Sequence, residues 1–249
     1  MITIHGNDPV GEFTPAGLLQ KAANKKEFKG IDFDLYCEDR GQPGLPQWSF
    51  DNYRLNGQFN AEASIHFYTQ PGWGNNFEKI LGRYRSQCHS YACDPDFHRP
   101  HEVEKIYDVG FIGQLDGDDR SNYLDLIRAN FPKCFISSST PNENVPLELS
   151  KCKVLFNHIR TEEINIRFFE NLAIGAQVVT HSPALHLFAN EGEHYLSCKT
   201  PEEAIEKMKL LVEDDEKREK MAKDARSHAL ANHTYRHRLI GMLKFANKI

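Results

Sequence analysis

Two glutamates in the stretch 162–180 have the spacing of residues that hold one ligand at two points. Glu162 and Glu170 are separated by seven residues, and the apolar periodicity around them predicts an amphipathic helix over 164–173. Eight helical residues rise about 12 Å, so one carboxylate lies at or before the start of the helix and the other lies well inside it. The two acids are therefore too far apart for a close catalytic pair, but they can grip an elongated ligand.

The residues after the second glutamate predict a helix end and a buried strand. Gly175 ends the helix as a C-terminal cap, and the apolar run 177–180 follows as a strand. Around this segment strands alternate with helices, which predicts a parallel sheet covered on both faces. The other strands are expected at 108–112, 134–138, 154–157 and 195–198, and the helices at 120–130, 145–150, 201–213, 215–232 and 234–248.

The first hundred residues predict a smaller α/β unit. Its strands are expected at 1–6, 31–37, 63–68 and 85–92, and its helices at 15–26 and 77–84. The segment 94–100, DPDFHRP, contains two prolines, which exclude regular helix and sheet and suit a stiff connection. We therefore place a domain boundary between residues 101 and 102.

The overall composition argues against several classes of protein. The chain has 249 residues, of which 40% are hydrophobic and 26% charged, and its net charge of −5 gives no broad footprint for nucleic acid. The N-terminus lacks the basic start and apolar core of a signal peptide, and no apolar run reaches about 18 residues. We expect a cytoplasmic protein without a membrane span, whose six cysteines are reduced.

Four pieces of the sequence resemble, in order, the signature of a known family. They are YDVGFIG at 107–113, KVLFN at 153–157, RFFENLAIGAQVVT at 167–180 and HTYRHR at 233–238. With the two glutamates, they resemble retaining GT-B glycosyltransferases of the family-4 type, in particular the spore-maturation-protein-B-like branch. The resemblance implies a GT-B-like α/β fold of two Rossmann-type domains with parallel sheets. A reduced acceptor-side domain would span 1–101, and a nucleotide-sugar-binding domain 102–249.

The same resemblance gives roles to residues of the second domain. Glu162 would hold the transferred sugar in catalysis, and Glu170 would bind the ribose hydroxyls of the nucleotide. Arg120 would contact the diphosphate, because a planar guanidinium suits two phosphate oxygens. Arg167, also a catalytic candidate, either reaches the diphosphate or holds Glu170. The remaining residues expected to bind the donor are Gly113, Asn157, Gly175, Ala176 and Gln177.

The first domain offers fewer candidates. Asp8 and Gly11 lie in the loop after the first strand, where we expect the acceptor, although any α/β unit has such a loop. His66 lies in the strand 63–68 and is the third catalytic candidate, although a structural role explains a strand histidine more readily. No metal site is expected, because the residues that suggest one do not have zinc-finger spacing. These residues are Cys88, Cys93, His98 and His101.

These observations lead us to expect a glycosyltransferase that uses a nucleotide sugar, a UDP-sugar first of all, and needs no metal or other cofactor. Its acceptor is open among a glycan, a protein, a small molecule and modified DNA. Retention of configuration follows only from the resemblance. Two alternatives remain: an inactive protein that binds nucleotide sugars or acts as a scaffold, and a glycosyltransferase acting on modified nucleic-acid bases.

Overall fold

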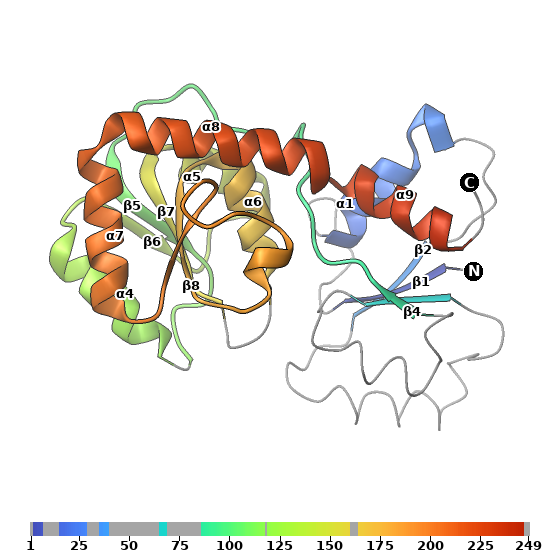
Figure 1. The fold of residues 1–249 in the computed structure, drawn as a ribbon, viewed down its shortest axis with the longest axis horizontal. Helices are drawn as coiled ribbons and strands as arrows, with labels where there is room; N and C mark the ends of the chain where they lie inside the picture. The colour runs from blue at the N-terminus through green and yellow to red at the C-terminus, as the bar shows by residue number, and fades with distance from the viewer. Residues whose placement is uncertain are drawn as a thin grey trace. The chain divides into compact units, whose positions relative to one another are not determined.

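The structure is a computed structural model that describes residues 2–6, 15–28, 35–39, 65–68, 86–117, 119–159 and 164–246. The chain divides into two compact units, residues 1–91 with 235–249 and residues 92–234. Within the described residues, each unit contains a parallel sheet with helices beside it (Figure 1). The predicted α/β class with parallel sheets is therefore confirmed.

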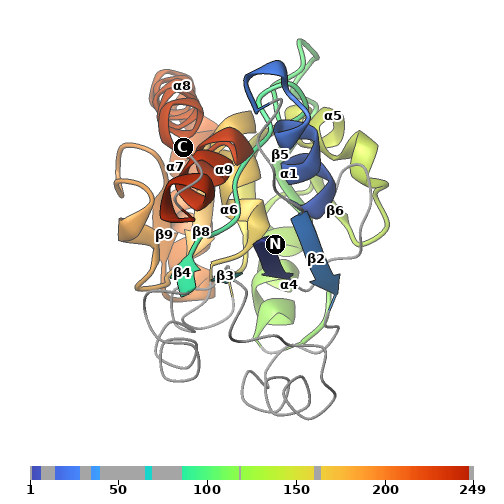
Figure 2. The ribbon, with the colours of Figure 1, turned by 90° about the vertical axis from the view of Figure 1, so that its right-hand side faces the viewer.

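In the first unit the described strands follow the order β2-β1-β3-β4, and Figure 2 shows them side by side. All the strand pairs in this sheet are parallel, as expected for an α/β unit. The helix α1 packs against α9, the last helix of the chain. The predicted helix 77–84 lies outside the described residues. The elements are β1 (Ile2–Gly6), α1 (Pro15–Ala23), η1 (Lys26–Phe28), β2 (Leu35–Asp39), β3 (Ile65–Tyr68), β4 (Ser86–Cys88) and α9 (Tyr235–Phe245).

In the second unit the described strands follow the order β6-β5-β7-β8-β9, again all parallel. The direction of the strand order reverses between β5 and β7. In open α/β sheets, ligands bind at the carboxyl ends of the strands beside such a switch point. The strands are β5 (Tyr107–Ile112), β6 (Cys134–Ser137), β7 (Cys152–Asn157), β8 (Gln177–Thr180) and β9 (Leu196–Cys198).

The helices of the second unit cover both faces of its sheet. The helices α4 and α7 lie together on one face, α5 and α6 contact the strands on the other, and α8 packs along α6 (Figure 1). Four of the predicted helices have the predicted bounds: α4 (Arg120–Asn130), α5 (Val145–Ser150), α7 (Pro201–Glu213) and α8 (Asp215–Asn232). The predicted helix 164–173 is α6 (Ile166–Ile174), and the predicted helix 234–248 is α9 of the first unit. The short turns η3 (Asn142–Asn144) and η4 (Leu185–Leu187) also belong to the second unit.

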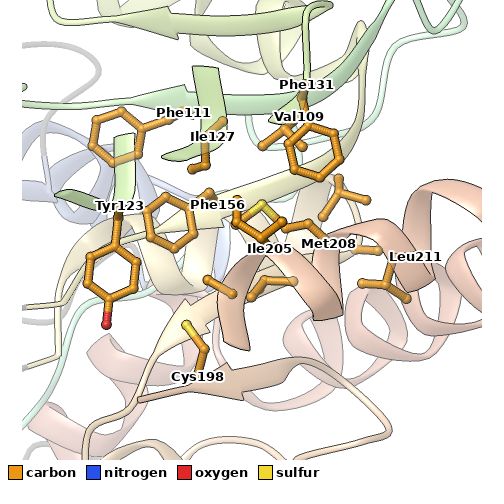
Figure 3. Close-up of a cluster of buried hydrophobic side chains, with 14 of the residues drawn as sticks. Val109, Phe111, Tyr123, Ile127, Phe131, Phe156, Cys198, Ile205, Met208 and Leu211 are labelled. Carbon is orange, nitrogen blue, oxygen red and sulfur yellow. The ribbon is translucent and has the colours of Figure 1, made fainter. Parts of the chain in front are cut away.

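Alternating residues of β5 and β7 build the larger core, between the sheet and the helices α4 and α7. Val109, Phe111 and Phe156 point into it and meet Tyr123 of α4 and Met208 of α7 (Figure 3). The Tyr123 and Phe156 rings stack with centroids 5.6 Å apart. Each large apolar side chain buried in this way contributes about 1.5–3 kcal/mol, so this core fixes the strands whose ends form the switch point.

The helix α6 is the most buried helix around the sheet, because all residues from Phe168 to Ile174 are buried. It begins at Ile166, two residues later than predicted, because Asn165 is its N-cap and accepts a hydrogen bond from the Phe168 N–H at 3.1 Å. Gly175 ends it, but with φ of −172°, an extended conformation open to any residue. The left-handed cap that a C-terminal glycine suggests is therefore absent here.

The division into units differs from the predicted boundary by ten residues, because residues 92–101 belong to the second unit. The Cys93 N–H donates to His233 O at 2.9 Å, and His98 contacts Glu170 on α6. These contacts attach the segment 94–100, which was predicted to connect the two domains, to the second unit. The last helix, α9, belongs to the first unit, where it packs on α1. The acceptor and donor roles of the two domains stay predictions.

Gly110 in β5 leaves no room for a side chain. A Cβ atom there would lie 2.4 Å from Cys152 Sγ and 2.9 Å from Cys152 Cβ, closer than nonbonded atoms approach. We expect Gly110→Ala to lower the free energy of unfolding by about 1–3 kcal/mol, because a packed interior must shift to admit the methyl group. Urea unfolding measures the change.

Gly175→Ala is the matched control for this substitution. A Cβ atom there would make ordinary contact with Leu155 at 3.6 Å, so we expect a change within about 0.5 kcal/mol. Adding Cys152→Ala to Gly110→Ala removes the clashing sulfur and should make the combined loss smaller than the sum of the two single losses. Equal losses at Gly110 and Gly175 would contradict this account.

Candidate functional site

Glu170, the second glutamate of the motif, is a buried carboxylate with a partner at each oxygen. Its side chain is only 8% exposed, and Arg167 Nη1 lies 2.5 Å from its Oε2. On the other oxygen, His98 Nε2 lies 3.3 Å from Oε1. The Arg167 contact is an ion pair between residues one helical turn apart on α6. Arg167 was expected either to reach the diphosphate or to hold Glu170, and the structure shows its contact with Glu170.

These partners fix the charge of Glu170. Burial by itself raises the pKa of a carboxyl group, because the ionised form loses its hydration. Here the guanidinium of Arg167 and the imidazole of His98 outweigh burial and hold the pKa of Glu170 at about 2. An ionised carboxylate accepts hydrogen bonds and donates none. A further ligand of Glu170 must therefore bring donors, such as hydroxyl groups.

Asn157 lies at the end of β7, as predicted, and its amide is paired within the protein. Its Nδ2 donates to Asn165 Oδ1 at 3.0 Å, and Asn165 Nδ2 donates back to Asn157 Oδ1 at 2.9 Å. Asn165 is also the N-cap of α6. The reciprocal pair therefore fastens the start of α6 to the end of β7. Contact between Asn157 and a donor stays a prediction.

A second clamp joins the end of β8 to the same edge of the sheet. Thr180 Oγ1 accepts from the Ile159 N–H at 2.7 Å and donates to Ile159 O at 3.0 Å. Both bonds are buried, so neither competes with water. The ends of β7 and β8 and the start of α6 thus form one hydrogen-bonded framework.

Gly113 and Arg120 bracket the loop that follows β5 at the switch point. The Gly113 N–H donates to Ser137 O at 3.0 Å, which joins this loop to the end of β6. Arg120 begins α4, as predicted, and its Nη1 donates to Gln114 O at 2.9 Å. With its side chain largely buried, the guanidinium supports the loop of its own strand. Its contact with a diphosphate stays a prediction.

His158 and Asp119 form a further pair at this edge, and neither is in the predicted set. His158 Nε2 lies 2.9 Å from Asp119 Oδ1, and the His158 ring stands edge-on to Tyr123 with centroids 5.3 Å apart. The Asp119 side chain is 62% exposed, whereas that of His158 is 3% exposed. The pair therefore links the residue after β7 to the residue before α4.

The predicted donor-binding residues 175–177 are held between α6 and β8. The Gly175 N–H bonds to Asn171 O at 2.9 Å, and Ala176 O accepts from the Leu155 N–H at 2.9 Å. Gln177 is fully buried, and its Nε2 donates to Phe168 O at 3.1 Å. These contacts join the helix to the strand, and the expected contact with a donor stays a prediction.

Four of the predicted residues cannot be placed in this site. Glu162, Asp8 and Gly11 lie outside the described residues. The backbone of His66 lies in β3, in register with Thr3 of β1, while its side chain is not among those described. The catalytic and acceptor-side roles of these four residues stay predictions.

Sequence reasoning missed Asn165 and the contact of His98, for different reasons. Asn165 carries a local signal, because asparagine directly before an apolar helical run is a preferred N-cap. His98 carries none, because its partner Glu170 is distant in sequence. In the sequence His98 stands out only as a metal candidate. Among the described residues, no three His, Cys, Asp or Glu side chains converge where they could hold a metal ion.

Within the described part of the chain, no helix is both long and apolar enough to cross a membrane. A family model described as glycosyl transferase-like matches residues 108–244. No curated protein matches the sequence. The family match covers the described switch point and the whole of α6.

Solved structures share the fold at low sequence identity. Sucrose-phosphate synthase from Thermosynechococcus elongatus is similar over 88% of this chain and 69% of its own, with a TM-score of 0.61 and 10% identity. Anabaena HepE in complex with UDP and glucose is similar over 99% of this chain and 71% of its own, with a TM-score of 0.64 and 10% identity. HepE in complex with UDP gives a TM-score of 0.64 at 11% identity, over 99% of this chain and 79% of its own. These matches confirm the predicted GT-B-like fold.

The burial of Glu170 and Arg167 predicts unequal effects when either partner is removed. Arg167→Met leaves a buried carboxylate without its cation, and we expect a loss of about 3 kcal/mol in the free energy of unfolding. Glu170→Gln should cost less, about 1–2 kcal/mol, because the Arg167 side chain is 19% exposed and can turn toward water. Urea unfolding at pH 7 tests the order of the two losses.

The ion pair of Arg167 and Glu170 also predicts how the loss of stability in Arg167→Met depends on pH. In the parent, the lowered pKa of Glu170 makes its contribution full above the ordinary value of 4.5, and it is lost as pH falls toward about 2. In Arg167→Met burial is opposed by His98 alone, so the pKa of Glu170 is depressed less than in the parent and the ionised carboxylate stabilises the fold less at neutral pH. The gap between parent and variant should therefore be larger at pH 7 than at pH 4. A gap that does not change with pH would contradict this assignment.

Proposed function

Because the matched model spans more than half of its length, the chain belongs to the glycosyl transferase-like family, and we propose that it transfers a sugar from a nucleotide sugar to an acceptor. The observation that carries the proposal is the buried Glu170 on α6, which lies with Arg167 inside the matched residues and is also contacted by His98, from the segment before them. UDP is the first donor nucleotide to consider, since HepE, which has a similar fold, was solved with UDP.

The chemistry of Glu170 suits the ribose of a nucleotide. The two adjacent hydroxyls of ribose are donors, and each oxygen of an ionised carboxylate can accept more than one hydrogen bond. Hydrogen bonds to a charged acceptor are stronger than neutral ones, each worth about 1.5–3 kcal/mol. The proposal therefore places the ribose at Glu170, as the family resemblance implies.

The leaving diphosphate needs positive charge, which basic side chains of the second unit can supply. When the bond between the sugar and the diphosphate breaks, the diphosphate leaves with the bonding electrons and gains negative charge, while an acceptor hydroxyl oxygen forms the new bond to the sugar and its proton passes to the diphosphate or to water. We assign the diphosphate to Arg120 and Arg167 and the transferred sugar to Glu162. Further donor contacts are assigned to the remaining predicted residues, Gly113, Asn157, Gly175, Ala176 and Gln177.

The finer parts of the proposal follow from the resemblance alone. They are the spore-maturation-protein-B-like branch, retention of configuration, independence of a metal and an acceptor beside Asp8 and Gly11. A catalytic part for His66 rests instead on its place in a strand of the first unit. The acceptor itself is a glycan, a protein, a small molecule or modified DNA. Each of these needs its own test once the donor is known.

Thermal shift with a panel of nucleotide sugars tests the donor site. The panel contains UDP, GDP, ADP, CMP and dTDP sugars, and we expect a UDP-sugar to raise the unfolding midpoint of the parent, because a ligand that binds only the native state stabilises it. Glu170→Ala should lose most of this shift, since about 1.5–3 kcal/mol of binding is removed for each lost hydrogen bond. Glu206→Ala, at an exposed position on α7, is the matched control and should keep the shift.

The possible results distinguish an active transferase, an inactive protein that binds nucleotide sugars and a scaffold protein. No shift with any nucleotide would refute the proposal and favour a scaffold protein. A shift with UDP-glucose, but no release or transfer of glucose with any acceptor, would identify an inactive protein that binds nucleotide sugars. A shift of equal size in the parent and in Glu170→Ala would place the nucleotide elsewhere.

A further inference from the structure

His98 is a buried histidine whose ring joins a turn of the chain to Glu170. Its side chain is 1% exposed, and its Nε2 lies 3.3 Å from Glu170 Oε1. On the other side of the ring, Nδ1 accepts a hydrogen bond from the Asp94 N–H at 2.9 Å. Because Nδ1 is the acceptor, the proton of the neutral ring is on Nε2, and Nε2–H donates to the carboxylate.

The turn that carries His98 is itself fixed by hydrogen bonds. Asp94 Oδ1 accepts from the Asp96 N–H at 2.9 Å and from the Phe97 N–H at 3.1 Å. The His98 N–H donates to Asp94 O at 2.7 Å. The Phe97 ring also stands edge-on to the His98 ring, with centroids 4.8 Å apart. The direction of the Nε2–H bond is therefore set by the turn and not by Glu170 alone.

Arg226 of α8 fastens the same turn to α6. Its Nη1 donates to His98 O at 3.1 Å and to Ala173 O at 2.6 Å. Ala173 lies on α6, three residues after Glu170, so the arginine joins the turn to the helix that carries the carboxylate. The turn and α6 are thus joined twice, by the contact between the His98 and Glu170 side chains and by Arg226 at the backbone of His98 and Ala173.

This arrangement constrains the carboxylate more than an ion pair alone would. Arg167, on the same helix as Glu170, contacts only one oxygen of the carboxyl group. The bond from His98 to Oε1, with Arg167 at Oε2, defines the plane of the group. Two adjacent hydroxyls can bind both oxygens together only when that plane is correctly oriented.

We propose that His98 is a positioning residue, which orients Glu170 to accept hydrogen bonds from the 2′- and 3′-hydroxyls of a nucleotide ribose. The inference rests on the proposed function, because it requires a nucleotide at Glu170. It adds a residue from the segment 94–98 to the donor site, and it makes the affinity for the ribose diol depend on that segment.

Two substitutions separate the functions of the two ring nitrogens. His98→Gln places an amide nitrogen near the position of Nε2, so it keeps the donor to Glu170 and loses the acceptor for Asp94. His98→Asn places an amide oxygen near Nδ1, so it keeps the acceptor and loses the donor. Binding of UDP and of 2′,3′-dideoxy-UDP is measured by calorimetry for the parent and for both variants.

The parent should bind UDP more tightly than the dideoxy nucleotide, because only UDP offers hydroxyls to Glu170. We expect His98→Asn to lose about tenfold in affinity for UDP and to keep its affinity for dideoxy-UDP, and His98→Gln to keep the preference for UDP. The rescue by glutamine distinguishes positioning from packing, because a structural defect would weaken both nucleotides in both variants.

The outcomes also separate this inference from the proposed function. A parent that binds neither nucleotide overturns the proposed function and the role of His98 with it. A parent that prefers UDP, with His98→Asn showing the same preference, overturns the role of His98 alone. Equal loss of both nucleotides in His98→Asn also overturns it.

A measurement on the parent decides the matter if His98→Asn does not fold. The ring nitrogens of His98 are observed by ¹⁵N NMR, with UDP and with dideoxy-UDP. We expect the Nε2 resonance to move with UDP and to stay in place with dideoxy-UDP. Identical responses to the two nucleotides would overturn the inference.

Discussion

A carboxylate buried within a helix must have its charge compensated, and the second unit is arranged around this requirement at Glu170. Arg167 supplies a cation from the same helix, and His98 supplies a donor from the segment 94–98. Removing either partner leaves a charge with less compensation inside the protein. The place of the segment 94–98 in the fold is therefore coupled energetically to α6.

The second constraint is the position of α6 relative to the sheet, which polar side chains determine at one end. The Asn157–Asn165 pair and the Thr180 clamp fix where the helix leaves the carboxyl edge of β7 and β8. Apolar packing alone allows a helix to slide or rotate at small cost, whereas paired amides have a single register. The helix start and the strand ends are consequently joined by hydrogen bonds, and Glu170 lies on the helix that they hold; a site for small polar groups requires such support.

Local patterns predicted the second unit well, because strand and helix periodicity are local properties. The bounds of α4 and α8 match those predicted from the sequence pattern, and the start of α6 was predicted two residues too early because Ile164 continues its apolar pattern. Contacts across the fold could not be predicted in this way. The histidine of His98 and the carboxylate of Glu170 meet through tertiary packing, and no spacing rule in one sequence relates them. Asn157 was expected at the correct edge of the sheet, but its partner was not foreseen for the same reason.

The structure makes the two roles considered for Arg167 compatible. A guanidinium has five N–H donors in a planar fork, and the contact with Glu170 involves one end of it. A diphosphate bound beside α6 would meet a cation that is already held in place by Glu170, so less side-chain entropy would be lost on binding. The carboxylate that accepts the ribose hydroxyls would then also fix the cation for the phosphate. Under the proposed function, this single ion pair would take part in recognising both parts of the nucleotide, in the orientation that we propose His98 sets.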